Sequence, residues 1–84
     1  MTNDQIEKFL TTNREQIHKP VKIAFKTRNS LEGIFIKMAD YNELKSKNFW
    51  HIVTGIHIDN YKKSNDTSLA RIFNGAEITR LSLK

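Results

Sequence analysis

The sequence contains no cysteine, which excludes disulfide bonds and thiolate metal sites. Its histidines, His18, His51 and His57, lie far apart in the chain, so we expect no metal and no other cofactor. No stretch approaches the ~20 apolar residues that a membrane span needs. The first residues include Asp4 and Glu7 and contain no apolar run of signal-peptide length. These absences favour a cytoplasmic protein without a membrane partner.

A length of 84 residues predicts a single domain over 1–84. Such a chain buries only about 60% of its unfolded surface, so small domains often depend on disulfides, a metal or self-association. Self-association is therefore the leading expectation here. The 14 Lys and Arg residues against 9 Asp and Glu residues give a net charge of +5, which favours polyanionic partners such as nucleic acid. The abundance of Lys, Asn and Ile is typical of AT-rich microbial or viral genomes.

The N-terminal segment has the pattern of a helix, predicted over about 3–18. Thr2 and Gln5 have the spacing of a capping box, and acidic residues follow in the first turn. Pro20 ends the helix. The predicted apolar stripe consists of Ile6, Phe9, Leu10 and Ile17. We expect this stripe to cover one end of a β-structure.

After Pro20 the apolar pattern changes to a period of two and predicts strands over about 20–83. The expected strands are 21–26, 31–40, 49–61, 69–73 and 77–83. Polar loops are expected at 27–30, 41–48 and 62–68, with a distorted strand as an alternative within 41–48. Asn74-Gly75 is a tight-turn signal.

Two strands carry further expectations. In the second, Ile34, Ile36 and Met38 share one face, while Leu31, Gly33 and Phe35 share the other, which predicts burial on both sides. In the third, Trp50, Ile52, Ile56 and Ile58 share a face opposite Phe49, Val53 and His57. Gly33 and Gly55 are expected at bends or bulges.

The predicted fold class is mainly β, with an N-terminal α-helix followed by a small, strongly bent five-stranded barrel of SH3-like or OB-like type. Catalysis is not expected, because the sequence has no phosphate-binding glycine loop and no nucleophile or zinc-protease motif. Asp40 with Glu43, or His51 with His57, are isolated polar residues without defined roles.

Two blocks of the sequence resemble the two motifs of the Sm/LSm family, which includes the bacterial Hfq branch. PVKIAFKTRNSLEGIFIKMAD is similar to the first motif, with its alternating strand, polar turn, internal Gly33 and final Asp40. RIFNGAEITRLSL is similar to the second motif, with Gly75 three positions before Ile78. The chain departs from the pattern twice. The Asn expected four positions after Asp40 has only Asn42 and Asn48 as counterparts, and Asn74 replaces the Arg that precedes the turn glycine.

The resemblance implies a homo-oligomeric ring of five to seven subunits that binds single-stranded, U- or A-rich RNA without catalysis, as an RNA chaperone or regulator. Stacking on an aromatic ring, amide contacts to bases and cations near phosphates would carry the binding. The residues it implies for RNA binding are Asp40, Tyr41, Asn42, Asn48, Arg71, Asn74 and Gly75.

Each of these candidates has a structural alternative. Tyr41 is equally compatible with packing on the barrel, and Asn42 and Asn74 with turn geometry. By default, four lysines are solvated surface groups, although together they would form a diffuse phosphate footprint: Lys45, Lys47, Lys62 and Lys63. Trp50 is by default a core or interface residue. Two other functions stay open: a structural ring that binds protein rather than RNA, favoured by the missing Arg before Gly75, and a monomeric SH3-like adaptor.

Overall fold

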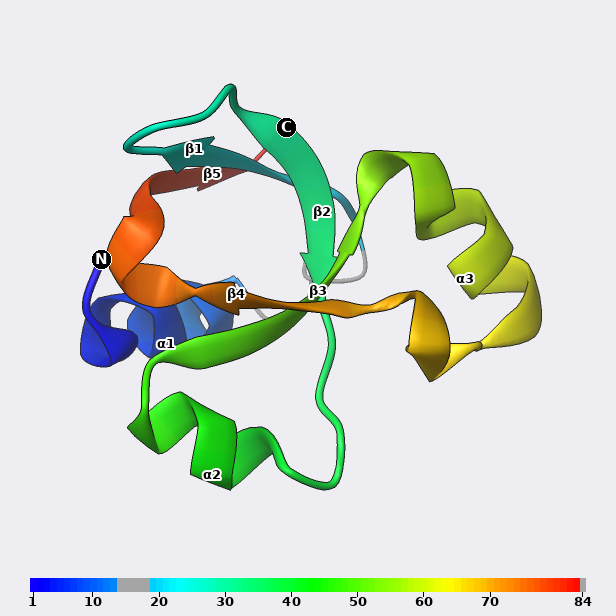
Figure 1. Cartoon of the computed structure of the whole chain (residues 1–84), viewed down its shortest axis with the longest axis horizontal. Helices are drawn as coiled ribbons and strands as arrows, with labels where there is room; N and C mark the ends of the chain where they lie inside the picture. The colour runs from blue at the N-terminus through cyan, green and yellow to red at the C-terminus, as the bar shows by residue number, and fades with distance from the viewer. Residues whose placement is uncertain (14–18, 84) are drawn as a thin grey trace.

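The computed structural model describes residues 1–13 and 19–83. Figure 1 shows an N-terminal helix beside a sheet, with two further helices at the periphery. The helices are α1 (Asn3–Thr12), α2 (Tyr41–Ser46) and α3 (Ile58–Ser64). The strands are β1 (Val21–Phe25), β2 (Leu31–Phe35), β3 (Phe49–Thr54), β4 (Arg71–Asn74) and β5 (Ile78–Leu83). Three 3-10 turns complete the described chain: η1 (Gly55–His57), η2 (Thr67–Leu69) and η3 (Gly75–Glu77).

Helix α1 begins with the predicted capping box. The backbone N–H of Gln5 donates to Thr2 Oγ1 at 3.2 Å, and the backbone N–H of Thr2 donates to Gln5 Oε1 at 2.9 Å. Ile6 and Leu10 are buried against the sheet, as the apolar stripe predicted. The helix ends at Thr12 with Asn13 as its C-cap. The rest of the predicted helix, including Ile17, lies outside the described residues.

The five strands form one antiparallel sheet in the order β4-β3-β2-β1-β5, which confirms a mainly β fold with five strands after a helix. In Figure 1, β2 runs between β1 and β5 on one side of the molecule and β3 and β4 on the other. Within the described residues the hydrogen-bonded order is open, with β4 and β5 as its two edges. The turn signal at Asn74-Gly75 marks η3, which connects these edges instead of closing a hairpin between paired strands.

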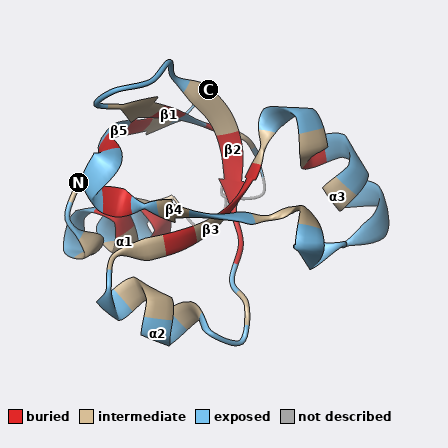
Figure 2. Ribbon diagram, viewed as in Figure 1, coloured by how far each residue is buried: buried red, intermediate tan, exposed pale blue. Residues whose placement is uncertain are grey.

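Both faces of β2 are buried, as its apolar pattern predicted. Leu31 and Phe35 pack with α1 and the inner face of the sheet, whereas Ile34 and Ile36 pack on the other face with Val53 and Ile58. Figure 2 shows buried residues along β2, β3 and the sheet-facing side of α1. The larger cluster consists of Ile6, Leu10, Val21, Ile23, Phe35, Trp50, Ile52, Ile78 and Leu81. Trp50 therefore belongs to the core.

Gly33 is required by close packing and not by a bulge. Its pairing with Val21 on β1 and Thr54 on β3 continues without interruption, and the register shift lies instead at Ala24/Phe25. A Cβ atom at Gly33 would lie 2.6 Å from Ile52 Cγ2. Of the expected bend or bulge at Gly33, the bulge was therefore wrong, and the glycine lets β2 approach β3 closely.

Several predicted boundaries were wrong, because irregular chain follows β2 and short helices occupy part of a predicted loop and the end of a predicted strand. The strand predicted over 31–40 ends at Phe35, and the loop predicted over 41–48 contains α2. The strand predicted over 49–61 ends at Thr54, where Gly55 opens η1 and α3 follows.

The apolar alternation that predicted a continuous strand over 49–61 agrees only in part with the observed burial. Ile56 is 85% exposed, whereas Ile58 is buried on the face of Val53 instead of that of Trp50. Ile58 and Tyr61, three positions apart, form the packed side of α3. Because α3 extends to Ser64, the loop predicted over 62–68 begins inside it.

Candidate functional site

Tyr41 is the first residue of α2 and lies half-buried at the edge of the core. Its ring meets that of Trp50 edge-on, with centroids 6.0 Å apart and an interplanar angle of 72°. The ammonium groups of Lys37 and Lys45 lie 5.0 and 5.7 Å from the centroid of the Tyr41 ring. Burial raises the pKa of Tyr41. The ring is thus held neutral between the core and two cations.

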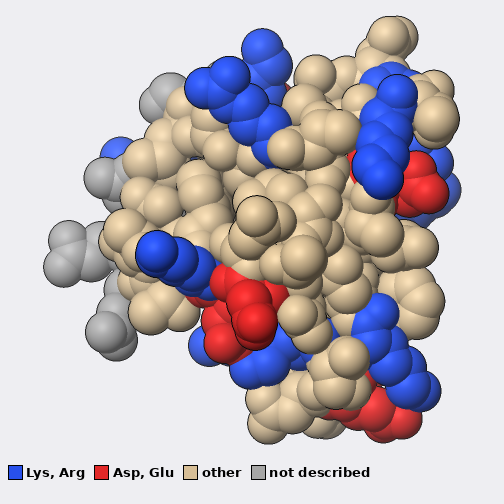
Figure 3. All heavy atoms as spheres, turned by 90° about the vertical axis from the view of Figure 1, so that its left-hand side faces the viewer, with Lys and Arg blue, Asp and Glu red and all other residues tan. Residues whose placement is uncertain are grey.

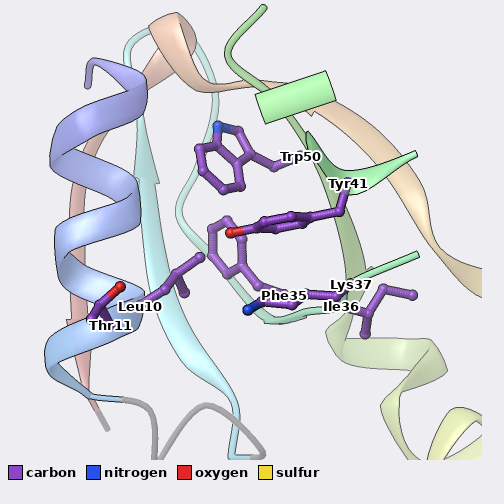
Figure 4. A pocket seen from close by; sticks show the side chains of 7 residues that line it. All are labelled: Leu10, Thr11, Phe35, Ile36, Lys37, Tyr41 and Trp50. Carbon is purple, nitrogen blue, oxygen red and sulfur yellow. The ribbon is translucent and has the colours of Figure 1, made fainter. Parts of the chain in front are cut away.

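The two lysines differ in how they are held. Lys45 donates to Glu7 of α1, and this hydrogen bond raises the pKa of Lys45. The ion pair connects α2 to α1, and the Glu7 carboxylate partly neutralises the charge of the Lys45 ammonium group. Lys37 follows β2, is exposed, and extends past Tyr41 in Figure 4. Lys37 is therefore the cation of this site that can reach an incoming anion.

A cavity of about 180 Å³ opens beside Tyr41. Figure 4 shows Tyr41, Phe35 and Trp50 on one side, with Leu10 and Thr11 of α1 across from them. The lining residues are Leu10, Thr11, Phe35, Ile36, Lys37, Tyr41 and Trp50. The cavity is smaller than the ~300–1,000 Å³ of sites for drug-sized ligands. It suits one planar ring system with a nearby negative charge.

A second cavity, of about 520 Å³, lies between the segment that follows β2 and helix α3. Its lining residues are Ile34, Phe35, Ile36, Lys37, Tyr61, Lys62 and Asn65. Phe35, Ile36 and Lys37 line both cavities. The two cavities are therefore neighbours that share one wall.

Asp40 directly precedes α2, and its carboxylate faces the His51 ring. His51 Nε2 lies 3.0 Å from Asp40 Oδ1 and 3.3 Å from Oδ2. Buried His51 Nδ1 has no hydrogen-bond partner among the described residues. The described chain contains no group of three or more His, Asp or Glu side chains that could hold a metal ion. Asp40 and His51 thus form a pair that fixes the start of α2 against β3.

Asn48 links three separate parts of the chain. Its Oδ1 accepts a hydrogen bond from Trp50 Nε1 at 2.8 Å, and its Nδ2 donates to the Met1 carbonyl at 2.9 Å. Its own carbonyl accepts from the N–H of Gly75 at 2.8 Å. The backbone of Asn48 has φ 62°, which Asn tolerates better than most residues. Both polar ends of this side chain are thus used by the fold.

The remaining candidates fall into two places. Gly75 is buried beside Asn48, and Asn74 Oδ1 accepts from the N–H of Ala76 at 2.9 Å, which shapes η3. Asn42 is exposed in the first turn of α2, next to Tyr41. Arg71 is exposed at the far end of β4, opposite Ile52. The structure therefore brings Asn48, Asn74 and Gly75 together, groups Asp40, Tyr41 and Asn42 at the start of α2, and leaves Arg71 apart.

Sequence reasoning did not single out Lys37, Tyr61 or Asn65, and it considered Lys62 only as part of a diffuse phosphate footprint. Lys37 and Tyr41 have a spacing of four, but the segment between them is not a helix, so this spacing carried no signal. Tyr61 was placed in a strand and Lys62 in a loop, whereas both belong to α3. That one short segment, 35–37, lines two cavities depends on the tertiary structure, so no sequence pattern indicates it.

The surface charge is not segregated on the side that carries α1 and η3. Figure 3 views this side and shows Lys and Arg side chains in separate groups, with Asp and Glu beside several of them. Uncharged side chains occupy the middle of this view. The described residues on this side therefore present no continuous basic surface to a polyanion.

None of the helices in the described ranges, 1–13 and 19–83, is both long enough and apolar enough to cross a membrane.

Comparison with protein families, with curated proteins and with solved structures finds no match for this chain.

Proposed function

We propose that this chain is the subunit of an Sm-like homo-oligomeric ring that binds single-stranded RNA without catalysis, with Tyr41 and Lys37 at the RNA site. The observation that carries the proposal is the Tyr41 ring, half-buried on the wall of an apolar cavity with the Lys37 and Lys45 ammonium groups within 6 Å of its centroid. An RNA chaperone or regulator acts through such binding alone.

The chemistry of this site matches that of a nucleotide. A base stacked on an aromatic ring contributes about 1–3 kcal/mol, and this contribution depends little on the base. A lysine near the phosphate adds an electrostatic contribution that salt weakens. The cavity beside Tyr41 has apolar walls for the base, and Lys37 lies at the same place for the phosphate.

The ring is supported by the edges of the sheet. Strands β4 and β5 each have one neighbour in the described structure, and Ile72 on β4 is 55% exposed. Unpaired edge strands offer free backbone donors and acceptors to another chain. Pairing of the β4 edge with the β5 edge of the next subunit is a head-to-tail contact, which closes into a ring when the rotation permits. The same contact adds the burial that so short a chain lacks.

The proposal is tested by fluorescence anisotropy with labelled U-rich and A-rich oligonucleotides. We expect the intact oligomer to bind, and Tyr41→Leu, which retains apolar contact with Trp50, to weaken binding at least about fivefold. Lys37→Ala should weaken binding and reduce the slope of log affinity against log salt concentration by the amount expected for about one phosphate contact. Lys63→Ala, which removes an exposed lysine of α3 outside both cavities, is the matched control.

Absence of binding at low salt by the intact oligomer would refute RNA binding. A sedimentation mass near that of one 9.8 kDa chain at micromolar concentration would refute the ring.

A structural ring that binds protein is the second candidate, and the use of Asn48, Asn74 and Gly75 by the fold favours it. These residues would read bases by analogy with the Sm pattern, yet here they tie Trp50, Met1 and η3 together. Assembly combined with RNA affinity no better than that of an equally charged control protein would select this second function.

A further inference from the structure

We propose that each subunit holds two consecutive nucleotides, one in each cavity, with the connecting phosphate at Lys37 and with α3 as the second half of the site. This inference rests on the proposed RNA binding and extends it to residues outside the Sm-like motifs. The second nucleotide would lie against Tyr61, Lys62 and Asn65.

The arrangement of the cavities carries the inference. Both are lined by Phe35, Ile36 and Lys37, so the two cavities lie against the same short segment of the chain. The wall is firmly held, because Phe35 and Ile36 are buried and the Ile36 N–H donates to the His51 carbonyl at 3.1 Å. Lys37 is exposed on the same wall. A flexible cation thus lies between two fixed cavities.

Each cavity also has its own tyrosine. Tyr41 lines the first, and Tyr61, half-buried against the cluster around Ile34 and Ile58, lines the second. Aromatic rings of this kind are the usual stacking platforms for bases in single-stranded nucleic acid. Each cavity thus combines one tyrosine with Lys37, which matches the order base, phosphate, base.

The charge of the lining selects the occupant. Among the described residues that line the two cavities, Lys37 and Lys62 are the charged ones, and none of these lining residues is an Asp or Glu. Asn65 adds an amide, which can donate to and accept from a base edge. A ligand with apolar rings joined by an anionic group satisfies these features, whereas an uncharged apolar peptide would leave both lysines unused.

Helix α3 is built in a way that fixes this second half. Ile58 is buried and anchors the first turn, and Asn65 at φ 54° ends the helix. Tyr61 and Lys62 lie between these two points. Their positions relative to the wall therefore depend on α3 remaining docked on the sheet.

The test compares the affinities of uridine monophosphate and of a 5′-phosphorylated uridine dinucleotide for the intact protein, measured by calorimetry. The dinucleotide should bind more tightly, and Tyr61→Leu and Lys62→Ala should each lower its affinity at least about fivefold. Lys63→Ala, one residue further along the same helix and outside the cavity lining, should leave it unchanged. Inorganic phosphate as a separate probe shows how much of the binding the lysines alone provide.

The outcomes separate this inference from the proposed function. RNA binding that is equally strong in Tyr61→Leu, Lys62→Ala and Lys63→Ala would overturn the second nucleotide position and leave the first intact. Failure of the unmodified protein to bind any oligonucleotide would overturn both.

Amide chemical shifts of the unmodified protein give a readout that needs no variant. The dinucleotide should shift Lys62 and Asn65 in addition to the residues around Tyr41, whereas the mononucleotide should shift them less. Shifts at α3 caused by an uncharged apolar peptide and not by the dinucleotide would overturn the inference in favour of a protein partner.

Discussion

Replacement of Gly75 by alanine should be among the most damaging single changes in this protein. A Cβ atom at this position would lie 2.2 Å from Asn48 Oδ1 and 2.7 Å from both Asn48 Cγ and Ile6 Cδ1. Asn48 cannot move away without cost, since its side chain bonds to Trp50 Nε1 and to the Met1 carbonyl. Ile6 is fully buried in the core. The added methyl group therefore meets fixed atoms on two sides.

The size of the effect follows from two costs. Forcing an extra methyl group into a packed site costs about 1–3 kcal/mol. If the Asn48 side chain swings out, the Trp50 N–H loses its partner, which costs about 1–3 kcal/mol. We expect Gly75→Ala to lower the free energy of unfolding by about 2–5 kcal/mol. A domain of 84 residues has roughly 4–13 kcal/mol in total, so this loss is a large fraction.

Urea denaturation at fixed protein concentration measures this loss, because oligomers gain apparent stability by mass action. Gly55→Ala is the matched control, since the nearest atom to a Cβ there, the Glu32 carbonyl oxygen, lies at an ordinary 3.7 Å. It should change stability by less than about 1 kcal/mol. Asn48→Gly retains the backbone at φ 62° and removes the obstructing side chain. The double variant Gly75→Ala with Asn48→Gly should therefore lose less than the sum of the two single variants.

An unfolding midpoint for Gly75→Ala within error of that for Gly55→Ala would refute this reasoning. Strict additivity in the double variant would show that the cost arises at Ile6 and not at Asn48.

Two further predictions concern the parts of the chain that hold the proposed RNA site. Tyr41 and Lys45 both have raised pKa values, by burial and by the Glu7 hydrogen bond respectively, so the folded state keeps their protons to higher pH than the unfolded state, for which the reference values are 10.0 and 10.5. The contribution of these two groups to stability should thus be complete below about pH 10 and should fall as the pH rises through the folded pKa values. Urea midpoints should show this decline, and the decline should be smaller in Lys45→Met than in Lys63→Met. Urea midpoints that stay constant at alkaline pH would contradict the prediction. Ile58→Ala should lower the free energy that holds α3 on the sheet by about 2–5 kcal/mol, because Ile58 is only 6% exposed. Hydrogen exchange should show the loss at α3 amides while β1 stays protected, and an equal loss at β1 would show that α3 does not open separately.

Local patterns in the sequence predicted the features that depend on near neighbours. The capping box at Thr2 and Gln5 formed because both partners lie within one turn. The alternation in β1 and β2 predicted the buried faces correctly, since the period of a strand fixes the side on which each residue lies. A helix followed by five strands was therefore predictable, with strand ends that shifted by several residues.

The short helices could not be predicted in the same way. Helix α2 has six residues and α3 seven, which is too short for intrinsic helix stability to produce a clear signal. In the region of α3, the spacing of Ile56 and Ile58 continues the alternation of β3, so the sequence predicts a bend or bulge at Gly55 within one strand. Only the docking of Ile58 on Val53 and Ile34 decides in favour of a helix, and that contact depends on the sheet already being formed.

The role of Asn48 also depends on distant parts of the chain, and it changes where RNA recognition should be sought. Its bonds to Met1 and Gly75 join residues that are far apart in sequence, so the residue types alone suggested a base-reading amide. The Asn48 side-chain amide is engaged in hydrogen bonds within the fold, and Asn74 Oδ1 accepts from the N–H of Ala76 in η3. These two side chains are therefore less available to contact a base. Tyr41, by contrast, keeps its ring on the wall of a cavity with Lys37 beside it. If this chain binds RNA, the affinity must therefore depend more on Tyr41 and Lys37 than on Asn48 or Asn74, and this order separates the proposed site from the one that the sequence motifs alone would give.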